Sequence, residues 1–350
     1  MELTSPTRKN IGIILNTTVI MILIGLAYAF VVGRGHLHVI INAIVIGFIV
    51  GSSSAIVELY IFVKFRQRFS FGVLLVVRTL FYVVLISCTV IYVGAMHESF
   101  MKSITLSETF ETKEFRTFMR GEFFQILAYA LAMSFAVNFV RQVNRLLGHN
   151  ALLDFITGKY HQPIAEERII MFLDLKSSTG IAERLGDMKY HSFLNDFFHD
   201  ISPAIQESRG SIYQYVGDEV VVTWTKARGL KDANCINCYF RVAAAIHLNS
   251  EKYQAKYGVV PEFKAGYHFG PVISGEIGDM KREIVFHGDT INTAARIRTE
   301  CTVFKKDLLL SADLLHHLPI EEYLSPESIG RIRLRGKEEE IELFTIREAA

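Results

Sequence analysis

The chain has 350 residues, of which 50% are hydrophobic, and its formal net charge at pH 7 is +1. This composition is too apolar for an ordinary soluble protein and favours a membrane part joined to a globular domain. The near-zero charge provides no overall attraction to a polyanion, so we expect no nucleic-acid partner. Four cysteines are too few for a disulfide framework and suit a reducing compartment.

Four apolar segments of roughly 20 residues each are long enough to span a bilayer. They are Ile11–Val32, Leu37–Val57, Phe71–Gly94 and Phe123–Val140. The first segment lacks a signal-peptide cleavage site, so we expect it to remain as an anchor. The sequence therefore predicts an α-helical transmembrane bundle over residues 1–145 that contacts the lipid bilayer.

Basic residues indicate the orientation of this bundle. They lie before the first segment, between the second and third, and after the fourth: Arg8, Lys9, Lys64, Arg66, Arg68, Arg141 and Arg145. The positive-inside rule then places both termini in the cytosol. We expect a multi-pass protein of the cell (inner) membrane whose C-terminal domain is cytoplasmic.

Two ionisable residues, Glu58 and Arg78, lie within or beside adjacent apolar segments, toward their cytosolic ends. One interpretation is that they form a paired sensor element. The other is that each side chain extends separately to the membrane interface. The sequence leaves both interpretations open.

Residues 146–164 form a predicted connector between the membrane bundle and the globular domain. An incomplete helical stripe of apolar residues runs into this connector from Val143 to Ile156 and is interrupted at Gly148. This stripe is typical either of a helix that pairs with its copy across a dimer or of an amphipathic helix on the membrane face.

Residues 165–350 alternate between strand and helix patterns. Ile169–Asp174 predicts a strand, and Thr179–Glu207 predicts a helix that begins at Ser178 or Thr179. Ser211–Val216 and Val220–Trp224 predict a hairpin whose turn is Gly217-Asp218-Glu219.

The second half of this region repeats the alternation. Leu230–Tyr257 predicts a helix, and Phe263–His268 with Val272–Glu276 predicts a hairpin around Gly270-Pro271. A helix begins near Asp289, and Arg331–Ile346 alternates like a final strand pair. The order β-α-β-β-α-β predicts a cytosolic α+β domain of the ferredoxin-like type.

Asp174 and Asp218 each stand where an apolar, strand-like run ends. If the sheet brings them side by side, they would hold the two divalent ions of a phosphoryl or nucleotidyl transferase. Leu175 and the residues after Asp174 lead into a helix N-terminus, a natural position for phosphate. The predicted phosphate-binding residues are Lys176, Ser177, Ser178 and Thr179.

Two downstream segments add polar groups. Asn292 and Arg296 are four residues apart, so they share one face of a helix. One can orient a ribose and the other can stabilise charge on pentavalent phosphorus, although a plain polar surface is the alternative. Arg335 lies in a basic turn, residues 333–337, that either reaches terminal phosphates or is solvated.

Taken together and in this order, five blocks resemble the signature blocks of the class III nucleotidyl cyclases. They are Phe172–Asp187, Tyr215–Val222, Phe263–Gly278, His287–Arg296 and Leu334–Lys337. The resemblance covers essentially the whole cytosolic part, and the first 145 residues carry none.

The resemblance implies roles for individual residues. Asp174 and Asp218 match the two metal-binding aspartates, and Leu175 matches a residue whose backbone carbonyl also touches metal. Asn292 and Arg296 match the pair that stabilises the transition state. One residue of the final turn, at position 335, matches a basic residue that contacts the triphosphate.

The resemblance also implies the reaction and the assembly. Two Mg²⁺ or Mn²⁺ ions would serve each active site, and the ribose 3′-oxygen would attack the α-phosphate of the same nucleotide and release pyrophosphate. Metals come from one protomer and the Asn/Arg pair from the other, so a homodimer with two composite sites is expected.

In this family the base is usually selected by two side chains, at positions that here hold Gln214 and Val285. Enzymes that use ATP tend to have Lys with Asp or Thr there, and enzymes that use GTP tend to have Glu with a small residue. Gln214 can face adenine or guanine, and Val285 forms no hydrogen bond, so we expect weak discrimination. By analogy we expect an adenylate cyclase that makes cyclic AMP from ATP.

Three alternatives remain open at this point. They are a guanylate cyclase, a catalytically silent cyclase-like sensor, and a dinucleotide-forming enzyme of the GGDEF type, in which Asn292 and Arg296 would have no role. Cys235 and Cys238 have ligand spacing, but no second pair follows, so we expect two semi-buried thiols on a helix. The histidines show no zinc-site spacing.

Overall fold

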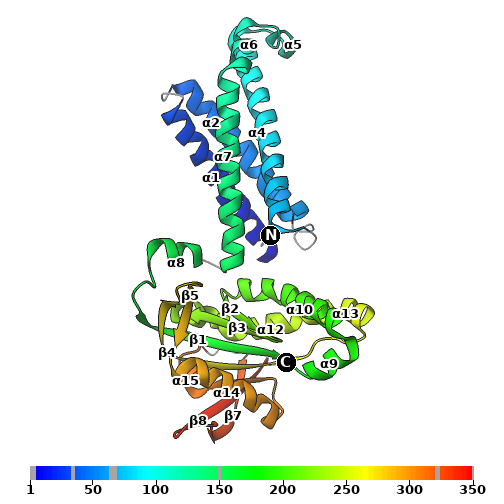
Figure 1. Ribbon diagram of the computed structural model, residues 1–350, viewed down its shortest axis with the longest axis vertical. Helices are drawn as coiled ribbons and strands as arrows, with labels where there is room; N and C mark the ends of the chain where they lie inside the picture. Colours follow the sequence, from blue (N-terminus) through cyan, green and yellow to red (C-terminus); the bar gives the residue numbers. More distant parts are fainter. Residues whose placement is uncertain (1–4, 33–35, 63–68, 149–150, 320–323, 349–350) are drawn as a thin grey trace. The chain divides into compact units, whose positions relative to one another are not determined.

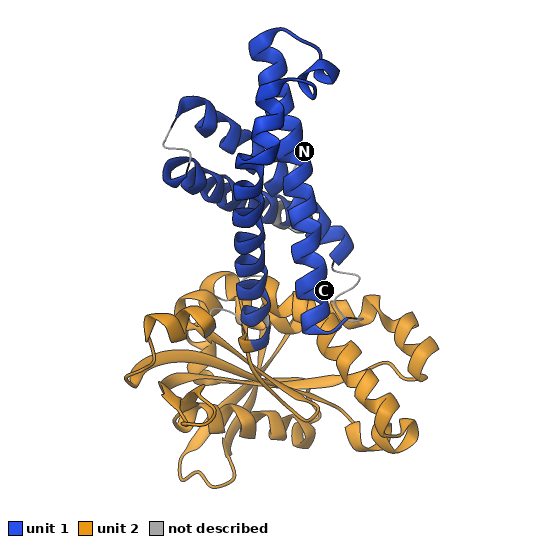
Figure 2. Ribbon diagram, turned by 45° about the horizontal axis from the view of Figure 1, so that its top comes forward, with its two compact units in different colours: residues 1–146 blue, residues 147–350 orange. Residues whose placement is uncertain are grey.

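Figure 1 shows the computed structural model, which describes residues 5–32, 36–62, 69–148, 151–319 and 324–348. The chain divides into two compact units, Met1–Leu146 and Leu147–Ala350 (Figure 2). Three of the basic residues that indicated the orientation, Lys64, Arg66 and Arg68, lie outside the described residues.

The first unit is helical. Within the described residues, four helices are long and apolar enough to cross a membrane, as predicted. They are α1 (Ser5–Val31), α2 (Leu37–Val57) with its π-helical continuation η1 (Glu58–Phe62), α4 (Phe71–Lys102) and α7 (Glu122–Leu147).

Two short helices occupy the segment between the third and fourth spans. They are α5 (Leu106–Thr109) and α6 (Lys113–Arg120). Thr105 forms a reciprocal capping box with Glu108, and Thr112 accepts a hydrogen bond from the backbone of Phe115. These threonine caps satisfy the free N–H groups of each first turn, so short helices form here.

Glycines allow α1 and α2 to pack closely. A Cβ atom added at Gly47 would lie 2.6 Å from the Cα of Ile22, and one added at Gly51 would lie 2.5 Å from the Cα of Thr18. Small residues four apart let two membrane helices approach until their backbones touch. This Gly47-Phe-Ile-Val-Gly51 pattern was readable from the sequence and was missed.

The two ionisable residues of the membrane unit are paired. Arg78 Nη2 lies 3.1 Å from Glu58 Oε1, and the Arg78 side chain is 1% exposed. Tyr82 donates a hydrogen bond to Glu58 at 3.3 Å. The structure therefore favours the paired interpretation over two side chains that extend separately to the interface.

The second unit is built on one eight-stranded sheet with the order β2-β3-β1-β4-β6-β8-β7, and β5 pairs with β4. The central strand β1 (Ile164–Leu175) pairs antiparallel with β3 (Glu219–Thr225) and β4 (Phe263–Ile277). The others are β2 (Ser211–Val216), β5 (Glu283–His287), β6 (Leu308–Ser311), β7 (Leu324–Arg333) and β8 (Glu340–Glu348).

Helices cover both faces of this sheet (Figure 1). Alternate residues of β1, such as Met171 and Leu173, join the main core with α10 (Asp187–Glu207), α12 (Asn234–Leu248) and α13 (Ser250–Tyr257). The intervening residue Phe172 packs on the other face, against Ala294 of α14 (Asp289–Phe304). Because side chains alternate along a strand, Asp174 also lies on the α14 face.

The predicted hairpin around Gly270-Pro271 is wrong, because Phe263–Ile277 is one continuous strand. Gly270 and Pro271 pair with Arg168 and Glu167 of β1. On the other edge of β4, the pairing with β6 ends at Tyr267 and the pairing with β5 begins at Ile273. Proline has no N–H to donate, so this unpaired stretch of edge tolerates it. The hairpin is formed by β4 and β5 instead.

Two predicted helices are each divided. The first becomes α9 (Ser178–Leu185) and α10, separated at Gly186, whose φ is +71°. The second, Leu230–Tyr257, becomes η2 (Lys231–Ala233), α12 and α13, and α11 (Lys226–Leu230) precedes it. The strand β6 and the short helix α15 (Ala312–Leu315) were not predicted.

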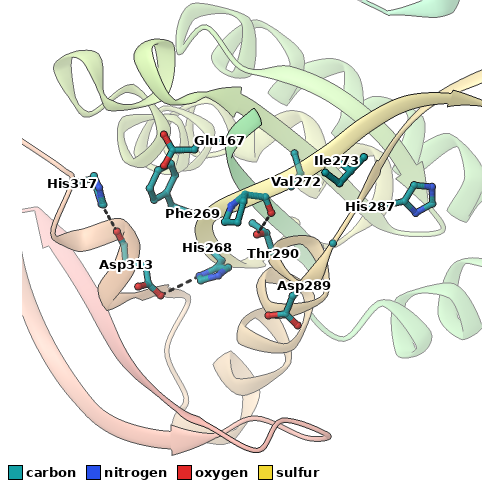
Figure 3. A pocket seen from close by; sticks show the side chains of 13 residues that line it. Glu167, His268, Phe269, Val272, Ile273, His287, Asp289, Thr290, Asp313 and His317 are labelled. Atoms are coloured by element: carbon teal, nitrogen blue, oxygen red, sulfur yellow. Dashed lines mark hydrogen bonds and ion pairs between the residues drawn. The ribbon is translucent and has the colours of Figure 1, made fainter. Parts of the chain in front are cut away.

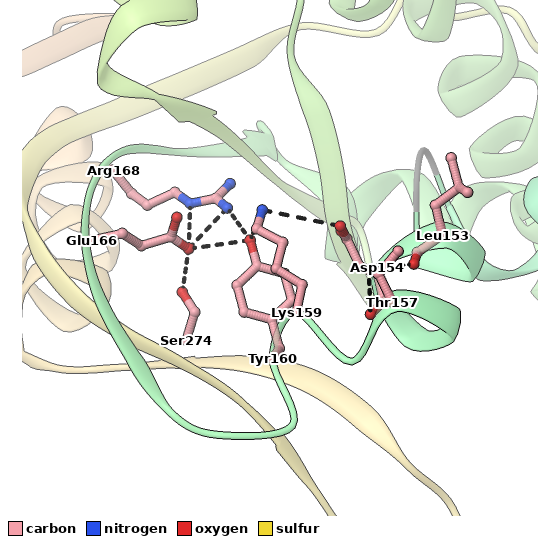
Figure 4. Close-up of polar contacts among 8 residues, drawn as sticks. All are labelled: Leu153, Asp154, Thr157, Lys159, Tyr160, Glu166, Arg168 and Ser274. Atoms are coloured by element: carbon pink, nitrogen blue, oxygen red, sulfur yellow. Dashed lines mark hydrogen bonds and ion pairs between the residues drawn. The ribbon is translucent and has the colours of Figure 1, made fainter.

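A polar network holds the segment between α8 (Ala151–Thr157) and β1 against the sheet (Figure 4). Tyr160 is 2% exposed, and its hydroxyl accepts hydrogen bonds from Lys159 at 2.8 Å and Arg168 at 2.9 Å. Glu166 accepts hydrogen bonds from Arg168 at 3.0 Å and from Ser274. The entry of the chain into β1 is therefore fixed by contacts within the second unit.

Candidate active site

The sheet register places charged residues side by side at one end of β1. Asp174 pairs with Glu219 of β3 on one side and with Lys264 of β4 on the other. Directly opposite side chains on neighbouring antiparallel strands lie close enough to interact. Asp218 immediately precedes Glu219 in the β2–β3 turn, and its charge acts on Asp174. The sheet thus brings Asp174 and Asp218 to the same end.

A cation from α14 joins this cluster. Arg298 Nη1 lies 3.2 Å from Asp174 Oδ2, and Arg298 Nε lies 2.7 Å from Glu219 Oε2. Lys264 Nζ lies 3.3 Å from Asp174 Oδ2. Sequence reasoning missed Arg298, Lys264 and Glu219, because only the register and the helix packing show that they meet.

Burial dominates the electrostatics of these carboxyl groups. It raises the pKa of Asp174, with Arg298 opposing the rise and Asp218 adding to it. Burial also raises the pKa of Glu219 to about 7, again against Arg298. Three carboxyl groups therefore face two cations, which do not fully offset the cost of burying the carboxylates.

The donor set fits a divalent metal that is shared with a phosphate ligand. Within the described residues, no group of three or more His, Cys, Asp or Glu side chains is arranged to hold a metal by itself. Mg²⁺ is usually held by one or two carboxylates together with substrate phosphates, rather than by a cage of protein ligands. The carboxylates of Asp174 and Asp218 and the carbonyl of Leu175 supply oxygen donors of that kind.

The predicted phosphate-binding segment makes contacts with residues distant along the chain. Lys176 directs its ammonium group to Asp307, at 2.6 Å, and its backbone N–H to Glu262. Ser177, with a φ of +54°, stands immediately before α9, and Ser178 and Thr179 form its first turn. A phosphate bound at this segment would therefore compete with Asp307 for the ammonium group of Lys176.

Asn292 and Arg296 project from α14, where Asn292 is exposed and Arg296 is half-buried. Arg298 is two residues beyond Arg296, and at 3.6 residues per turn it lies on the opposite side of the helix. The predicted pair therefore does not share the face of α14 that contacts Asp174 in the same chain.

Arg296 lies instead beside the basic turn. Its Nη2 would be 3.5 Å from a Cβ added at Gly336. Lys337 of the same turn forms an ion pair with Asp289 in the first turn of α14, and Arg335 is exposed. The structure thus gathers the predicted transition-state arginine and the predicted triphosphate turn into one basic cluster.

The two predicted base-reading positions lie on strands that do not pair with each other. Gln214 is exposed on β2, and Val285 is half-buried on β5. Their chain neighbours Tyr213 and Phe286 pack together with ring centroids 4.7 Å apart, and the Phe286 N–H donates to the Tyr213 hydroxyl at 3.4 Å. This contact brings the two positions near each other.

Residues 160–348 match the family model described as the adenylate and guanylate cyclase catalytic domain. The chain belongs to this cyclase family. Its second unit is the cyclase domain, and the resemblance seen in the sequence is confirmed.

Similar proteins support the same assignment. Adenylate cyclase 2 of Rhizobium meliloti (strain 1021) is 37% identical over 221 residues, which cover 63% of this chain and 61% of that protein. An adenylate cyclase of Anabaena cylindrica is 24% identical over 188 residues, covering 51% of this chain and 36% of that protein. The chain thus matches less than two thirds of the length of each.

Solved structures agree on the fold. A bacterial light-regulated adenylyl cyclase superposes with a TM-score of 0.55 at 20% identity, over 64% of this chain and 65% of that one. At this identity the likeness establishes the cyclase fold alone.

The cyclase domain has a cavity of about 600 Å³ that none of the predicted site residues lines (Figure 3). It lies where α14 begins, along the unpaired edge of β4. His268 borders it and forms a 2.8 Å hydrogen bond with Ser311, and burial lowers the pKa of His268 to about 4. The cavity lies apart from the carboxylate cluster.

Cys235 and Cys238 are fully buried in α12 of the cyclase domain. Burial raises the pKa of Cys238 to about 12, so its thiol stays protonated. A protonated, buried thiol is inert as a nucleophile and as a metal ligand. The expectation of structural thiols holds, although they are more deeply buried than predicted.

Proposed function

We propose that this protein is a membrane-anchored adenylate cyclase that converts ATP to 3′,5′-cyclic AMP and pyrophosphate. The observation that carries the proposal is the undercompensated carboxylate cluster around Asp174 at the end of β1. A site with excess negative charge and oxygen donors suits divalent cations bound with a triphosphate.

The predicted metal-binding and transition-state residues each have a role in this reaction. Asp174, Asp218 and the Leu175 carbonyl would hold two Mg²⁺ or Mn²⁺ ions, which when bound neutralise the phosphates and lower the pKa of the attacking 3′-hydroxyl. Asn292 orients the ribose, and Arg296 stabilises the charge that develops on the α-phosphate.

The remaining polar groups position the triphosphate. Backbone groups of Ser177, Ser178 and Thr179, at the start of α9, face a phosphate, and Arg335 binds the terminal phosphates. Positioning and electrostatics supply most of the rate in phosphoryl transfer, so no covalent role is needed for the protein.

The geometry of α14 favours a homodimer. Arg298 contacts the metal carboxylates of its own chain, so Asn292 and Arg296, on the other side of the helix, are free to complete the site of a partner. Each dimer would then contain two composite sites.

ATP is the proposed substrate because Gln214 can pair with N1 and N6 of adenine. The Rhizobium meliloti relative is named an adenylate cyclase. Guanylate cyclase is the second candidate, since Gln214 can also face guanine and Val285 discriminates against neither base.

The membrane part completes the proposal. The four apolar helices would anchor the protein in the cell (inner) membrane, with both termini and the cyclase domain in the cytoplasm. Residues 1–145 would form the membrane domain, 146–164 the connector and 165–350 the catalytic domain.

The test uses the full-length protein in membranes, with ATP and GTP offered separately. We expect cyclic AMP to form faster than cyclic GMP, and faster turnover of GTP would overturn the substrate assignment. Asp174→Asn should lower the rate by roughly 1000-fold, the scale of losing metal stabilisation of a phosphoryl transition state. An unchanged rate would exclude the two-metal scheme.

Complementation tests the composite site. Asp174→Asn and Arg296→Ala, each inactive alone, should regain about a quarter of the wild-type rate when mixed, because half of random dimers are mixed and each has one intact site. The matched control mixes Asp174→Asn with Asp218→Asn, which damage the same half-site and should not complement. Equal rates from both mixtures would contradict the composite dimer.

A further inference from the structure

Arg298 bridges two carboxylates that belong to neighbouring strands. Its guanidinium reaches Asp174 through Nη1 and Glu219 through Nε, at 3.2 and 2.7 Å. The side chains of Asp174 and Glu219 are 12% and 10% exposed, and that of Arg298 is 26% exposed. This is a largely buried bridge, where charge pairing counts for more than on the surface.

The sheet register explains why a bridge is required. Asp174 and Glu219 are direct cross-strand partners, and like charges in that arrangement repel each other. The Arg298 guanidinium donates a hydrogen bond to Asp174 and forms an ion pair with Glu219, so one arginine contacts both carboxylates at once. Lys264, on the other side of Asp174, contacts only that carboxylate of the two and also donates to Thr302 at 2.9 Å.

The close approach of α14 to the sheet makes this bridge possible. Gly266 of β4 lies directly beneath the helix, and a Cβ added there would be 2.2 Å from the backbone nitrogen of Arg298. Any side chain at position 266 would push the helix away from the sheet. The absence of a side chain at Gly266 therefore sets the distance between α14 and the sheet, and so allows Arg298 to reach the carboxylates.

We propose that Arg298 is the positioning residue of the metal site. It holds Asp174 and Glu219 together in the metal-free protein, and its positive charge weakens the binding of a divalent cation beside them. The inference rests on the proposed two-metal function and deepens it, because it assigns the metal affinity of the site to a residue outside the metal ligands.

This assignment gives the two sides of α14 different roles. Arg296 lies beside Gly336 in the basic cluster, and Arg298 lies on the carboxylates. Two arginines two residues apart therefore serve different groups, and replacing one should not reproduce the effect of replacing the other.

The experiment measures binding of Mn²⁺ alone to the full-length protein in nanodiscs of zwitterionic lipid, by loss of the electron paramagnetic resonance signal of free Mn²⁺. Arg298→Gln should bind Mn²⁺ about fivefold more tightly than wild type, because one nearby positive charge is removed. Asp174→Asn defines the binding that does not involve the site.

A second readout follows the stability of the same samples. The single tryptophan, Trp224, is buried in the core of the cyclase domain, so its fluorescence reports unfolding of that domain. Arg298→Gln should lower the unfolding midpoint without metal, and Mn²⁺ should raise it by more than in wild type. Loss of folding cannot produce tighter Mn²⁺ binding, so the two readouts together exclude a merely structural effect.

Two further variants serve as controls. Arg298→Lys keeps the charge but cannot bridge both carboxylates, so its Mn²⁺ affinity should stay near wild type while its metal-free midpoint falls. Lys306→Gln removes one of the two cations that pair with Glu327 of β7, which makes no ion pair with the carboxylate cluster, and should change neither readout.

The outcomes separate the two proposals. If Asp174→Asn lowers Mn²⁺ binding but Arg298→Gln leaves it unchanged or weaker, the inference about Arg298 is overturned and the metal scheme stands. If wild type and Asp174→Asn bind Mn²⁺ alike, the two-metal function fails and the inference fails with it.

Discussion

Each unit of this protein buries an arginine against acidic side chains, and the two clusters differ in charge balance. In the membrane unit, Arg78 pairs with Glu58 at 3.1 Å and lies 5.1 Å from the centroid of the Phe62 ring. One guanidinium and one carboxylate make a neutral pair. In the cyclase domain, Arg298 and Lys264 face three carboxyl groups.

This difference indicates what each cluster is suited to do. A neutral pair in an apolar environment satisfies its own charges, so it stabilises the packing of the helices that carry it. An undercompensated cluster retains attraction for a further cation. In our proposal, the same residue type stabilises helix packing in one unit and holds the metal-site carboxylates together in the other.

The largest expected effect comes from removing one carboxylate in the membrane unit. Glu58→Gln removes the carboxylate that pairs with the buried Arg78 and should cost about 3 kcal/mol of stability. The measurement is unfolding of the full-length protein by SDS, followed by far-ultraviolet circular dichroism.

The matched control is the same carboxyl-to-amide change in the other unit. Asp174→Asn should cost less than about 1 kcal/mol, because Arg298 keeps Glu219 and an unfavourable cross-strand repulsion is removed. The double variant Glu58→Gln with Arg78→Met should recover most of the stability lost in Glu58→Gln. Equal losses of stability in Glu58→Gln and Asp174→Asn would contradict the difference between the two clusters.

His268 of the cyclase domain is buried and neutral, so the pH dependence of stability tests what it costs to place a charge at this position. Burial lowers the pKa of His268 from 6.5 to about 4, with Asp313 opposing the shift and Lys337 adding to it. The unfolded chain takes up this proton below pH 6.5 and the folded chain does not. Stability should therefore fall as the pH drops from 6.5 to 4, by up to about 3 kcal/mol.

Denaturant unfolding followed by Trp224 fluorescence at several pH values measures this effect. His268→Gln keeps a hydrogen-bonding group beside Ser311 but has no proton to gain. The difference in stability between wild type and this variant should change across the stated window. A difference that is constant with pH would show that His268 is not held neutral by the fold.

A smaller effect than that of Glu58→Gln is expected from moving α14 away from the sheet. Gly266→Ala places a methyl group against the backbone of Arg298 and should cost about 2 kcal/mol, a typical cost of overpacking. Because the bridge to Asp174 and Glu219 is then strained, Mn²⁺ affinity should rise as in Arg298→Gln. Gly72→Ala in α4, where no atom lies within 4 Å of the added Cβ, is the control.

Much of the architecture was predictable because local patterns carry it. The four apolar segments, the β2–β3 hairpin and the start of α14 near Asp289 follow from hydropathy and turn residues over short stretches. The predicted helix boundaries were less accurate where a single glycine ends a helix. Gly186 divides the long predicted helix, because its left-handed backbone conformation ends α9.

The errors arose where a distant strand overrode a local signal. Gly270-Pro271 is a strong turn signal, yet pairing with β1 keeps both residues in an extended strand. The contacts of Lys176 with Asp307 and Glu262 were also not readable from the local sequence, because both partners are distant along the chain.

The order of its motifs was enough to reveal a cyclase domain behind a membrane bundle, because residue type and spacing persist however the chain folds. The residues that surround Asp174 were determined only by the tertiary structure. Glu219, Lys264 and Arg298 come from two other strands and a helix, and their meeting depends on strand register and on the absence of a side chain at Gly266. Register and helix height are set by packing over the whole sheet, so no local stretch of sequence specifies them.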